Sequence, residues 1–345
     1  MELVKVKTAK SVVVKEAGKL QLEVRTLPTL QPGEARVKVQ FASICGSDIH
    51  IWHGHNPFAQ YPRVIGHEFC GVIDEVYEPS QQHRVGQFVV IDPVISCGHC
   101  YPCRVGRPNV CKTLQVIGVH RDGGFSQYVN VPLQNAYAAP RAVSPELCSL
   151  VEPFSIAANI SAFLKPVSED CALIYGAGPM GLTAVQVLKN VYQVAEVIVV
   201  DRIEERLVRA QANGADSVLN NLQQPLCDQL AGKQPTLIID AACHPNILAE
   251  AAQIISPAGR IGLLGFSHEP CTVTQQALTS KELSIFTSRL NSGRFPQVIE
   301  WFEQGLVQPE KLVTDSFALQ DAEQAMHRFE TAVKHSCKVL LSVDQ

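Results

Sequence analysis

Four cysteines in one short stretch constrain this chain more than any other feature. The sequence SCGHCYPCRVGRPNVC places Cys97, Cys100, Cys103 and Cys111 with two, two and seven residues between them. Thiolates so close in sequence can converge on one tetrahedral Zn²⁺ without long-range folding. The intervening glycines and prolines predict a turning surface lobe, which favours zinc over buried free thiols or two disulfides. Four thiolates leave no open coordination position, so this zinc would be structural and the chemistry must lie elsewhere.

Length and charge limit what the chain can be. Its 345 residues exceed what one hydrophobic core usually serves, so we expect two domains. Lys and Arg total 29 against 33 Asp and Glu, without long runs of one sign, which argues against nucleic acid or an anionic membrane as partners. The N-terminal stretch has scattered charges and no leader pattern, and no apolar run approaches the length of a membrane span. We expect a cytoplasmic protein, whose twelve cysteines are metal ligands or buried thiols.

The apolar pattern changes near residue 150. Before it, short alternating runs such as EARVKVQF are separated by turns, which predicts an antiparallel, barrel-like β domain over residues 1–154 with the zinc lobe at about 92–112. Over residues 155–287, compact apolar strands such as CALIY and VIVVD alternate with helical segments, which predicts an α/β domain with a doubly wound parallel sheet. Residues 288–345 do not extend this repeat, so we expect them to return to the first domain.

A glycine motif marks the nucleotide site of the second domain. Gly176, Gly178, Pro179, Met180 and Gly181 stand in GAGPMG, directly after the strand CALIY and at the start of a helix. The glycines allow a tight turn, close approach of a pyrophosphate to backbone N–H groups, and close packing of helix on strand. The sequence therefore predicts a Rossmann dinucleotide site at this turn.

The cofactor preference depends on the end of the next strand. Asp201 lies twenty residues beyond Gly181, where a carboxylate can accept hydrogen bonds from the adenine ribose hydroxyls and repel a 2′-phosphate. This predicts NAD. Two alternatives stay open: Asp201 could also cap the following helix, and Arg202 or Arg206 could accept a phosphate.

A second group of metal-binding residues is dispersed, with Cys45 in ICGSDIH, His67 and Glu68 in VIGHEFCG, and Glu152 in VEPFS. Periodicity does not group them. Singly, each could be an ordinary core or surface residue, and Glu152 could favour a helix N-terminus.

The motifs together carry a family resemblance. ICGSDIH, GHE, the four-cysteine lobe, GGFSQY, EP and GAGPMG occur in the order and approximate spacing of the zinc-dependent medium-chain alcohol dehydrogenases, so the chain resembles that superfamily over essentially its whole length. Glu152 stands where the simplest alcohol dehydrogenases have a cysteine, as in the polyol, sorbitol and threonine dehydrogenase branch. Longer matches such as GHNPFAQYPRVIGHE resemble the subfamily of bacterial starvation-sensing proteins and hexonate dehydrogenases, which oxidise L-gulonate or L-galactonate.

The resemblance implies a GroES-like catalytic domain with a second, catalytic zinc. Its ligands would be Cys45, His67 and Glu152, with Glu68 as an alternative or water-mediated ligand and a fourth position open for water or the substrate oxygen. Ser47 and His50 would begin a proton relay, although they could equally be a turn serine and a surface histidine. The further cofactor contacts that it implies are Arg206, Leu264, Gly265 and Lys338. Of these, Arg206 and Lys338 could instead be solvated charges.

The implied reaction is reversible oxidation of a secondary alcohol to a ketone with NAD, by a homodimer or homotetramer, on a polyol or sugar acid. In the family, polar segments approach the substrate; here they contain His53, His55, Asn56, His120, Arg121, Arg289 and Asn291. Arg289 and Arg294, with Arg121 behind them, are candidates for binding a substrate carboxylate. Alternatives are a polyol or L-threonine-type dehydrogenase and, in another class, a non-catalytic cofactor-binding regulator or structural zinc protein.

Overall fold

The structure is a computed structural model that describes residues 7–343. Part of the N-terminal stretch on which the leader expectation rests lies outside that range. The chain divides into two compact units, Met1–Glu152 with Val313–Gln345, and Pro153–Leu312. The return to the first unit thus begins at Val313, and residues 288–312, which we expected in the first domain, group with the second.

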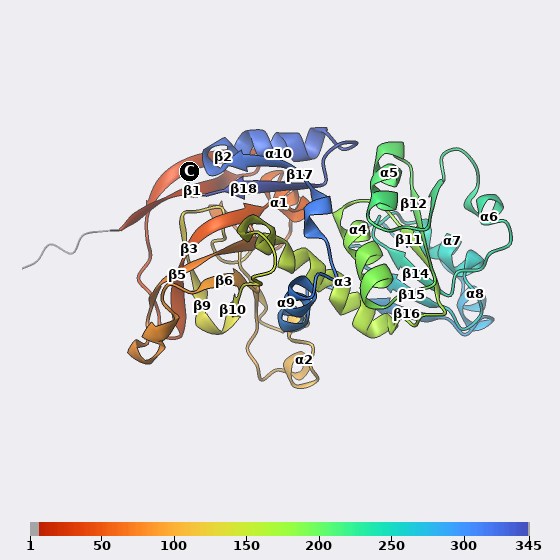
Figure 1. Cartoon of the computed structure of the whole chain (residues 1–345), viewed down its shortest axis with the longest axis horizontal. Coiled ribbons are helices and arrows are strands. Elements are labelled where there is room, and N and C mark those ends of the chain that lie inside the picture. The colour runs from red at the N-terminus through yellow and green to blue at the C-terminus, as the bar shows by residue number, and fades with distance from the viewer. Residues whose placement is uncertain (1–6, 344–345) are drawn as a thin grey trace, which may run out of the picture. The chain divides into compact units, whose positions relative to one another are not determined.

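The first unit is rich in β structure (Figure 1). Its larger sheet has the order β10-β6-β5-β3-β18-β17, with β9 also paired to β3, and a smaller sheet has the order β2-β1-β4. The strands are β1 (Thr8–Glu16), β2 (Lys19–Thr26), β3 (Glu34–Ser43), β4 (Arg63–Val64), β5 (Glu68–Val76), β6 (Phe88–Ile91), β9 (Tyr128–Pro132), β10 (Ala136–Ala138), β17 (Val313–Ala318) and β18 (Lys338–Ser342). Val37 and Val39 of β3 are fully buried, as the alternation predicts.

The register of three strands brings distant residues to one place. β3 pairs antiparallel with β5, where Ser43 faces Glu68, and with β18, where Ser43 faces Leu340. Helix α1 (Gly46–Trp52) begins directly after β3, with Cys45 as its N-cap. The end of β3, the start of β5 and β18 therefore lie together beside the first turn of α1.

Shorter elements complete the first unit. The cysteine lobe consists of the pair β7 (Val94–Ile95) and β8 (Gln115–Val116), helix α2 (Tyr101–Arg104) and the 3₁₀ turn η2 (Pro108–Val110). The remaining helical elements are η1 (Pro79–Arg84), η3 (Leu133–Asn135), η4 (Pro145–Leu150), η7 (Leu319–Asp321) and α10 (Ala322–Thr331), which connects the parallel strands β17 and β18.

The second unit is a parallel sheet of order β13-β12-β11-β14-β15-β16. Its strands are β11 (Cys171–Tyr175), β12 (Glu196–Asp201), β13 (Ser217–Asn220), β14 (Leu237–Asp240), β15 (Arg260–Leu263) and β16 (Ser284–Thr287). The helical elements are α4 (Pro179–Gln186), the π turn η5 (Val187–Val191), α5 (Glu204–Ala212), α6 (Leu226–Gln229), α7 (Ile247–Ile254), α8 (Gln275–Thr279), α9 (Phe295–Glu303) and η6 (Pro309–Leu312), while α3 (Val151–Leu164) runs from the first unit into the second.

This strand order is that of a doubly wound dinucleotide-binding sheet, with its topological switch point between β11 and β14. Helices α4 and α5 lie along one face of the sheet and α7 along the other (Figure 1). The central strands β11 and β14 are almost entirely buried, which explains their continuous apolar sequences. The predicted fold class, a Rossmann domain with a β-rich GroES-like domain, is confirmed.

One helical stretch in residues 7–343, Pro145–Leu164, is long and apolar enough to cross a membrane by length and composition. From the sequence we expected no apolar run of that length, because Glu146 and Glu152 interrupt the apolar residues of this stretch. Of its most apolar window, 78% is buried inside the protein, as in the core helix of a folded unit.

Candidate active site

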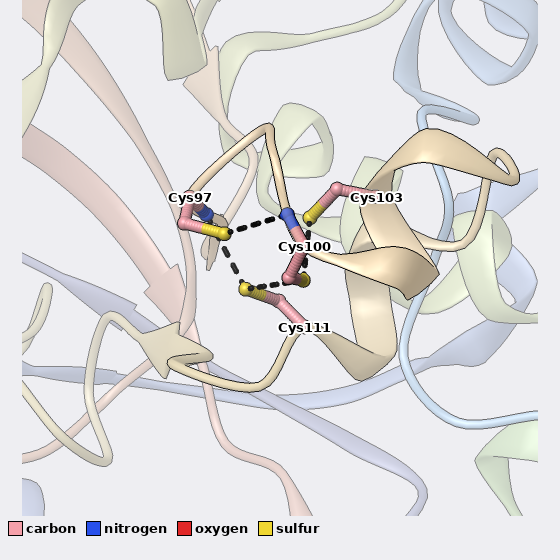
Figure 2. A group of neighbouring side chains, drawn as sticks. All are labelled: Cys97, Cys100, Cys103 and Cys111. Carbon is pink, nitrogen blue, oxygen red and sulfur yellow. Dashed lines mark hydrogen bonds between the residues drawn. The ribbon is translucent and has the colours of Figure 1, made fainter.

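The four cysteines of the lobe form one tight group (Figure 2), and their Sγ atoms all lie within 4.8 Å of one another. The Sγ of Cys100 lies 3.4 Å from that of Cys103 and 3.7 Å from that of Cys111. Zn–S bonds of about 2.3 Å in a tetrahedron place sulfurs at such separations. All twelve cysteines are free thiols, so the disulfide alternative is not the one adopted.

Backbone N–H groups of this lobe donate hydrogen bonds to sulfur atoms and so favour the thiolate form. The N–H of Cys97 donates to Sγ of Cys111 at 3.3 Å, and that hydrogen bond is the main reason why the pKa of Cys111 is lowered to about 6. The N–H of Lys112 likewise lowers the pKa of Cys100. Burial raises the pKa of Cys103 to about 11. Four neighbouring sulfurs and backbone donors that favour anions fit a closed zinc site.

A second metal-binding group lies where β3, β5 and α1 meet. One ligand atom from each of Cys45, His67 and Glu68 lies within 4.8 Å of the others. Cys45 precedes α1, His67 precedes β5, and Glu68 begins that strand. Thiolate, imidazole and carboxylate are the ligand types of catalytic zinc sites, which keep one position open.

Glu152, the carboxylate predicted as the third ligand, lies outside that 4.8 Å group. It is 5% exposed, in the first turn of α3. Burial raises its pKa to about 7; the charge of Glu68 adds to this effect, while the charges of His67 and Lys338 oppose it. The pKa of Glu152 therefore depends on the charges of the second metal-binding group. Its role as a zinc ligand stays a prediction.

Asp48 connects two of the predicted ligands, a role that the sequence analysis missed. Its Oδ2 accepts the N–H of Cys45 at 2.9 Å, and its Oδ1 accepts the N–H of Gly66 at 3.1 Å and lies 3.6 Å from Nδ1 of His67. Burial lowers the pKa of His67, but Asp48 outweighs it, so the pKa is raised. An acidic residue three positions after an N-cap in CGSD was a usable signal for such a backbone contact.

Glu68 is engaged by a cation from the other end of the chain. Both of its oxygens contact Nζ of Lys338, at 2.5 and 2.6 Å, and Oε2 also accepts the hydroxyl of Ser43. Lys338 is 1% exposed and Glu68 is fully buried. The alternative of a solvated Lys338 is therefore wrong, and this contact favours a role at the metal group over the cofactor contact that the resemblance implied.

The two predicted relay residues lie on α1. The hydroxyl of Ser47 is 3.5 Å from Nε2 of His67, so it borders the metal group. His50 is exposed near the end of the helix, with its ring 6.3 Å from that of His55. The structure thus brings Ser47, but not His50, to the metal group.

The glycine motif has the geometry that its sequence predicts. Gly176 has a φ of 95°, which favours glycine, and a Cβ on Gly181 would lie only 1.8 Å from the carbonyl oxygen of Gly176. Gly178 is the N-cap of α4, which begins at Pro179 with Met180 in its first turn. The helix N-terminus and the turn before it thus offer backbone N–H groups to an anion.

A pocket of about 580 Å³ opens beside this turn. Its lining includes Gly176, Gly178, Asp201, Arg202, Arg206 and His244. Asp201 ends β12, and its oxygens accept the N–H groups of Ala177 at 2.8 Å and Ile203 at 2.9 Å. These hydrogen bonds hold the carboxylate of Asp201 at the pocket wall. The same carboxylate can therefore accept hydrogen bonds from the turn before α5 and lie where a ribose would bind.

Leu264 and Gly265 lie at the end of β15. The N–H of Leu264 donates to the carbonyl of Asp240 at 3.0 Å, and a Cβ on Gly265 would lie 2.7 Å from Sγ of Cys243. Neither lines the pocket described above. Their cofactor contacts stay predictions.

The candidate carboxylate-binding arginines differ in their surroundings. Arg289 lies over the Phe266 ring, 5.6 Å from its centroid. Arg294 is the N-cap residue of α9, and its Nε is buried without a hydrogen-bond partner among the described residues. Arg121 is ion-paired with Glu34 at 2.5 Å, which makes it the weakest of the three candidates.

Comparison with known proteins shows the family to which this chain belongs. Residues 31–141 match the family model of the alcohol dehydrogenase GroES-like domain, and residues 179–304 match that of the zinc-binding dehydrogenases. The chain is 56% identical to the starvation-sensing protein RspB of Escherichia coli K12, over 97% of this chain and 100% of that protein. It is 29% identical to the L-galactonate-5-dehydrogenase of the same organism, over 93% and 95% of the two chains.

A solved structure agrees with these matches. The crystal structure of the RspB alcohol dehydrogenase from E. coli CFT073, complexed with NADH, superimposes with a TM-score of 0.95 at 55% identity, over 97% of this chain and 99% of that one. A two-unit zinc dehydrogenase is thus the class of protein that fold and site define. The chain belongs to the zinc-type medium-chain alcohol dehydrogenase superfamily. The predicted enzyme class, and zinc and NAD as cofactors, are confirmed at the level of this family.

Proposed function

We propose that this enzyme oxidises a secondary alcohol of a six-carbon sugar acid, L-gulonate or L-galactonate, to a ketone with NAD. The observation that carries the dehydrogenase chemistry is the buried group of Cys45, His67 and Glu68, which offers thiolate, imidazole and carboxylate within 4.8 Å. A regulator or structural protein has no need of such an incomplete ligand set, which argues against the non-catalytic alternative.

The residues of the metal group have distinct proposed roles. Cys45, His67 and Glu152 would hold a zinc, which supplies Lewis acidity that lowers the pKa of a bound alcohol. Asp48 orients Cys45 and His67 through the contacts described above. Ser47, beside His67, is placed to take the hydroxyl proton and pass it towards His50.

The pocket at the carboxyl ends of β11 and β12 would take the dinucleotide. Asp201 supports NAD over NADP, because its carboxylate is fixed at the wall where the adenine ribose would lie. Arg206 also lines this pocket, where it would lie near the adenine ribose. The NADH-bound relative supports the same preference.

The sugar-acid assignment rests on chemistry and likeness. A carboxylate substrate needs a cation at a distance from the reacting hydroxyl, and Arg294 offers a guanidinium with one unsatisfied buried N–H. The L-galactonate-5-dehydrogenase relative supports a hexonate. We also propose that the enzyme is cytoplasmic and forms a homodimer or homotetramer.

A substrate survey tests this proposal. Purified enzyme is given NAD with L-gulonate, L-galactonate, sorbitol, xylitol and L-threonine, and NADH formation is followed at 340 nm. We expect one hexonate to give the highest kcat/KM. Equal or better turnover of sorbitol or xylitol would identify a polyol dehydrogenase, better turnover of L-threonine a threonine-type dehydrogenase, and no turnover of any alcohol would favour a non-catalytic role.

A further inference from the structure

We propose that Lys338 is a positioning residue of the metal group: its buried ammonium holds the Glu68 carboxylate and so keeps that carboxylate from filling the metal's open coordination position. The proposal rests on the proposed function only in taking Cys45, His67 and Glu152 as the ligands of a catalytic zinc.

The contact itself is unusually complete. The ammonium bridges both carboxylate oxygens at 2.5 and 2.6 Å, and the hydroxyl of Ser43 donates to one of them. Lys338 is 1% exposed, while Glu68 and Ser43 are fully buried.

Without this cation, Glu68 would be a natural fourth ligand. It lies within 4.8 Å of the ligand atoms of Cys45 and His67, and carboxylate oxygens bind Zn²⁺ well. A zinc with four protein ligands is closed, as in the cysteine lobe, and cannot take a substrate oxygen. Competition between Lys338 and the metal for one carboxylate therefore decides whether the site is open.

Charge balance leads to the same assignment. The thiolate of Cys45 and the carboxylates of Asp48, Glu68 and Glu152 would carry four negative charges, of which a Zn²⁺ and the Lys338 ammonium would offset three. Loss of the ammonium would raise the uncompensated buried charge from one to two, which is strongly unfavourable. Direct coordination of the metal by Glu68 would relieve part of that cost, at the expense of the open position.

The backbone explains how so distant a residue reaches the metal group. β18 begins at Lys338 and pairs with β3, whose last residue Ser43 faces Glu68 across the pairing with β5. Lys338 is thus held by a strand of the larger sheet, and its position does not depend on a flexible loop.

The test uses the full-length enzyme and three variants, Lys338→Met, Glu68→Gln and the double variant. Lys15→Met is the matched control, because it breaks a Lys–Glu pair of 3.0 Å, with Glu23, that is partly exposed. Co²⁺ is substituted for the catalytic zinc and its visible absorption is recorded, since the positions and strengths of the cobalt bands change when a carboxylate replaces water as a ligand. The Kd for NADH and the kcat for the best alcohol are measured on the zinc enzymes.

We expect Lys338→Met to change the cobalt spectrum and to lower kcat by about tenfold or more, with the Kd for NADH within about twofold of wild type. The double variant should recover the wild-type spectrum, because no free carboxylate remains to bind the metal. The control should match wild type.

Two results would overturn the proposal. A Kd for NADH raised about tenfold with an unchanged cobalt spectrum would make Lys338 a cofactor contact. A double variant whose cobalt spectrum matches that of Lys338→Met would remove Glu68 from the explanation. If Lys338→Met does not fold, the cobalt spectra of the double variant and of Lys338→Arg test the proposal instead. Both variants should keep the wild-type spectrum. The spectrum and the Kd need no substrate, so they decide this proposal even if the substrate assignment fails.

Discussion

Oδ1 of Asp48 lies 3.6 Å from Nδ1 of His67, and the other oxygen of the same carboxylate accepts the N–H of Cys45 at 2.9 Å. One buried side chain therefore orients two predicted metal ligands from different elements. Groups that orient ligands in this way contribute about 10–100-fold to metal affinity or activity.

Asp48→Asn should weaken zinc retention at the catalytic site by about 10–100-fold, because an amide is a poorer partner for both the imidazole and the N–H of Cys45. Metal analysis after dialysis against graded chelator measures this. Asp74→Asn is the control, since Asp74 contacts Lys7 at 3.5 Å on the surface of the same unit. Equal zinc retention in Asp48→Asn and wild type would contradict the prediction.

Cys100→Ser should remove the structural zinc and lower the melting temperature by roughly 10 °C or more, because the metal replaces a hydrophobic core in holding the lobe together. Circular dichroism on heating, together with metal analysis, measures both effects. Cys227→Ser is the matched control, because that cysteine is exposed and outside both metal groups. An unchanged melting temperature together with two zinc ions per chain would rule out a structural metal at this lobe.

Cys45→Ala should abolish turnover yet leave a folded protein that retains one zinc and binds NADH. The reason is that Cys45 belongs to the open ligand set, whereas the four cysteines of the lobe do not depend on it. Wild type should contain two zinc ions per chain. A wild-type content of one zinc or none in carefully prepared enzyme would defeat this prediction.

Asp201→Ser should narrow the preference for NAD over NADP by about 10–100-fold, since it removes both the ribose hydrogen bonds and the repulsion of a 2′-phosphate. The ratio of kcat/KM with the two cofactors measures the change. Asp216→Ser in the same unit is a control on a carboxylate outside the pocket. Wild-type enzyme that uses both cofactors equally would refute the role of Asp201.

Neutralising the arginine that binds the substrate carboxylate should weaken hexonates by about 1.5–3 kcal/mol and leave uncharged polyols nearly unchanged. Arg294→Gln and Arg289→Gln are compared, and Arg121→Gln serves as the control because Glu34 already pairs with Arg121. The kcat/KM values for a hexonate and for sorbitol give the two free energies. Loss of both activities in parallel would point to a folding defect instead.

Features that are local in sequence could be predicted. The cysteine lobe is encoded within sixteen residues, and the glycine motif follows its strand directly, so spacing and turn chemistry were sufficient. The parallel sheet followed from continuous apolar strands between helical segments.

Features that depend on the register of strands distant in sequence could not be predicted. The pair of Lys338 and Glu68 spans 270 positions and exists because β18 and β5 both pair with β3, a relationship that no pattern in either segment indicates. The ion pair of Arg121 with Glu34 could not be predicted from the sequence for the same reason. Residues 288–312 were misplaced because α9 is amphipathic and carries no mark of the unit against which it packs.

The position of β18 between β3 and β17 in the larger sheet also bears on how the protein is made. Synthesis proceeds from the N-terminus, and domains generally fold as their sequence emerges. The Rossmann unit is continuous, so it can fold while residues 313–345 are still to be made. The catalytic unit must wait for these residues, because Lys338 and the strand that carries it leave the ribosome after the whole Rossmann unit. A chain that ends early would therefore carry a finished nucleotide fold beside a metal group without its buried cation.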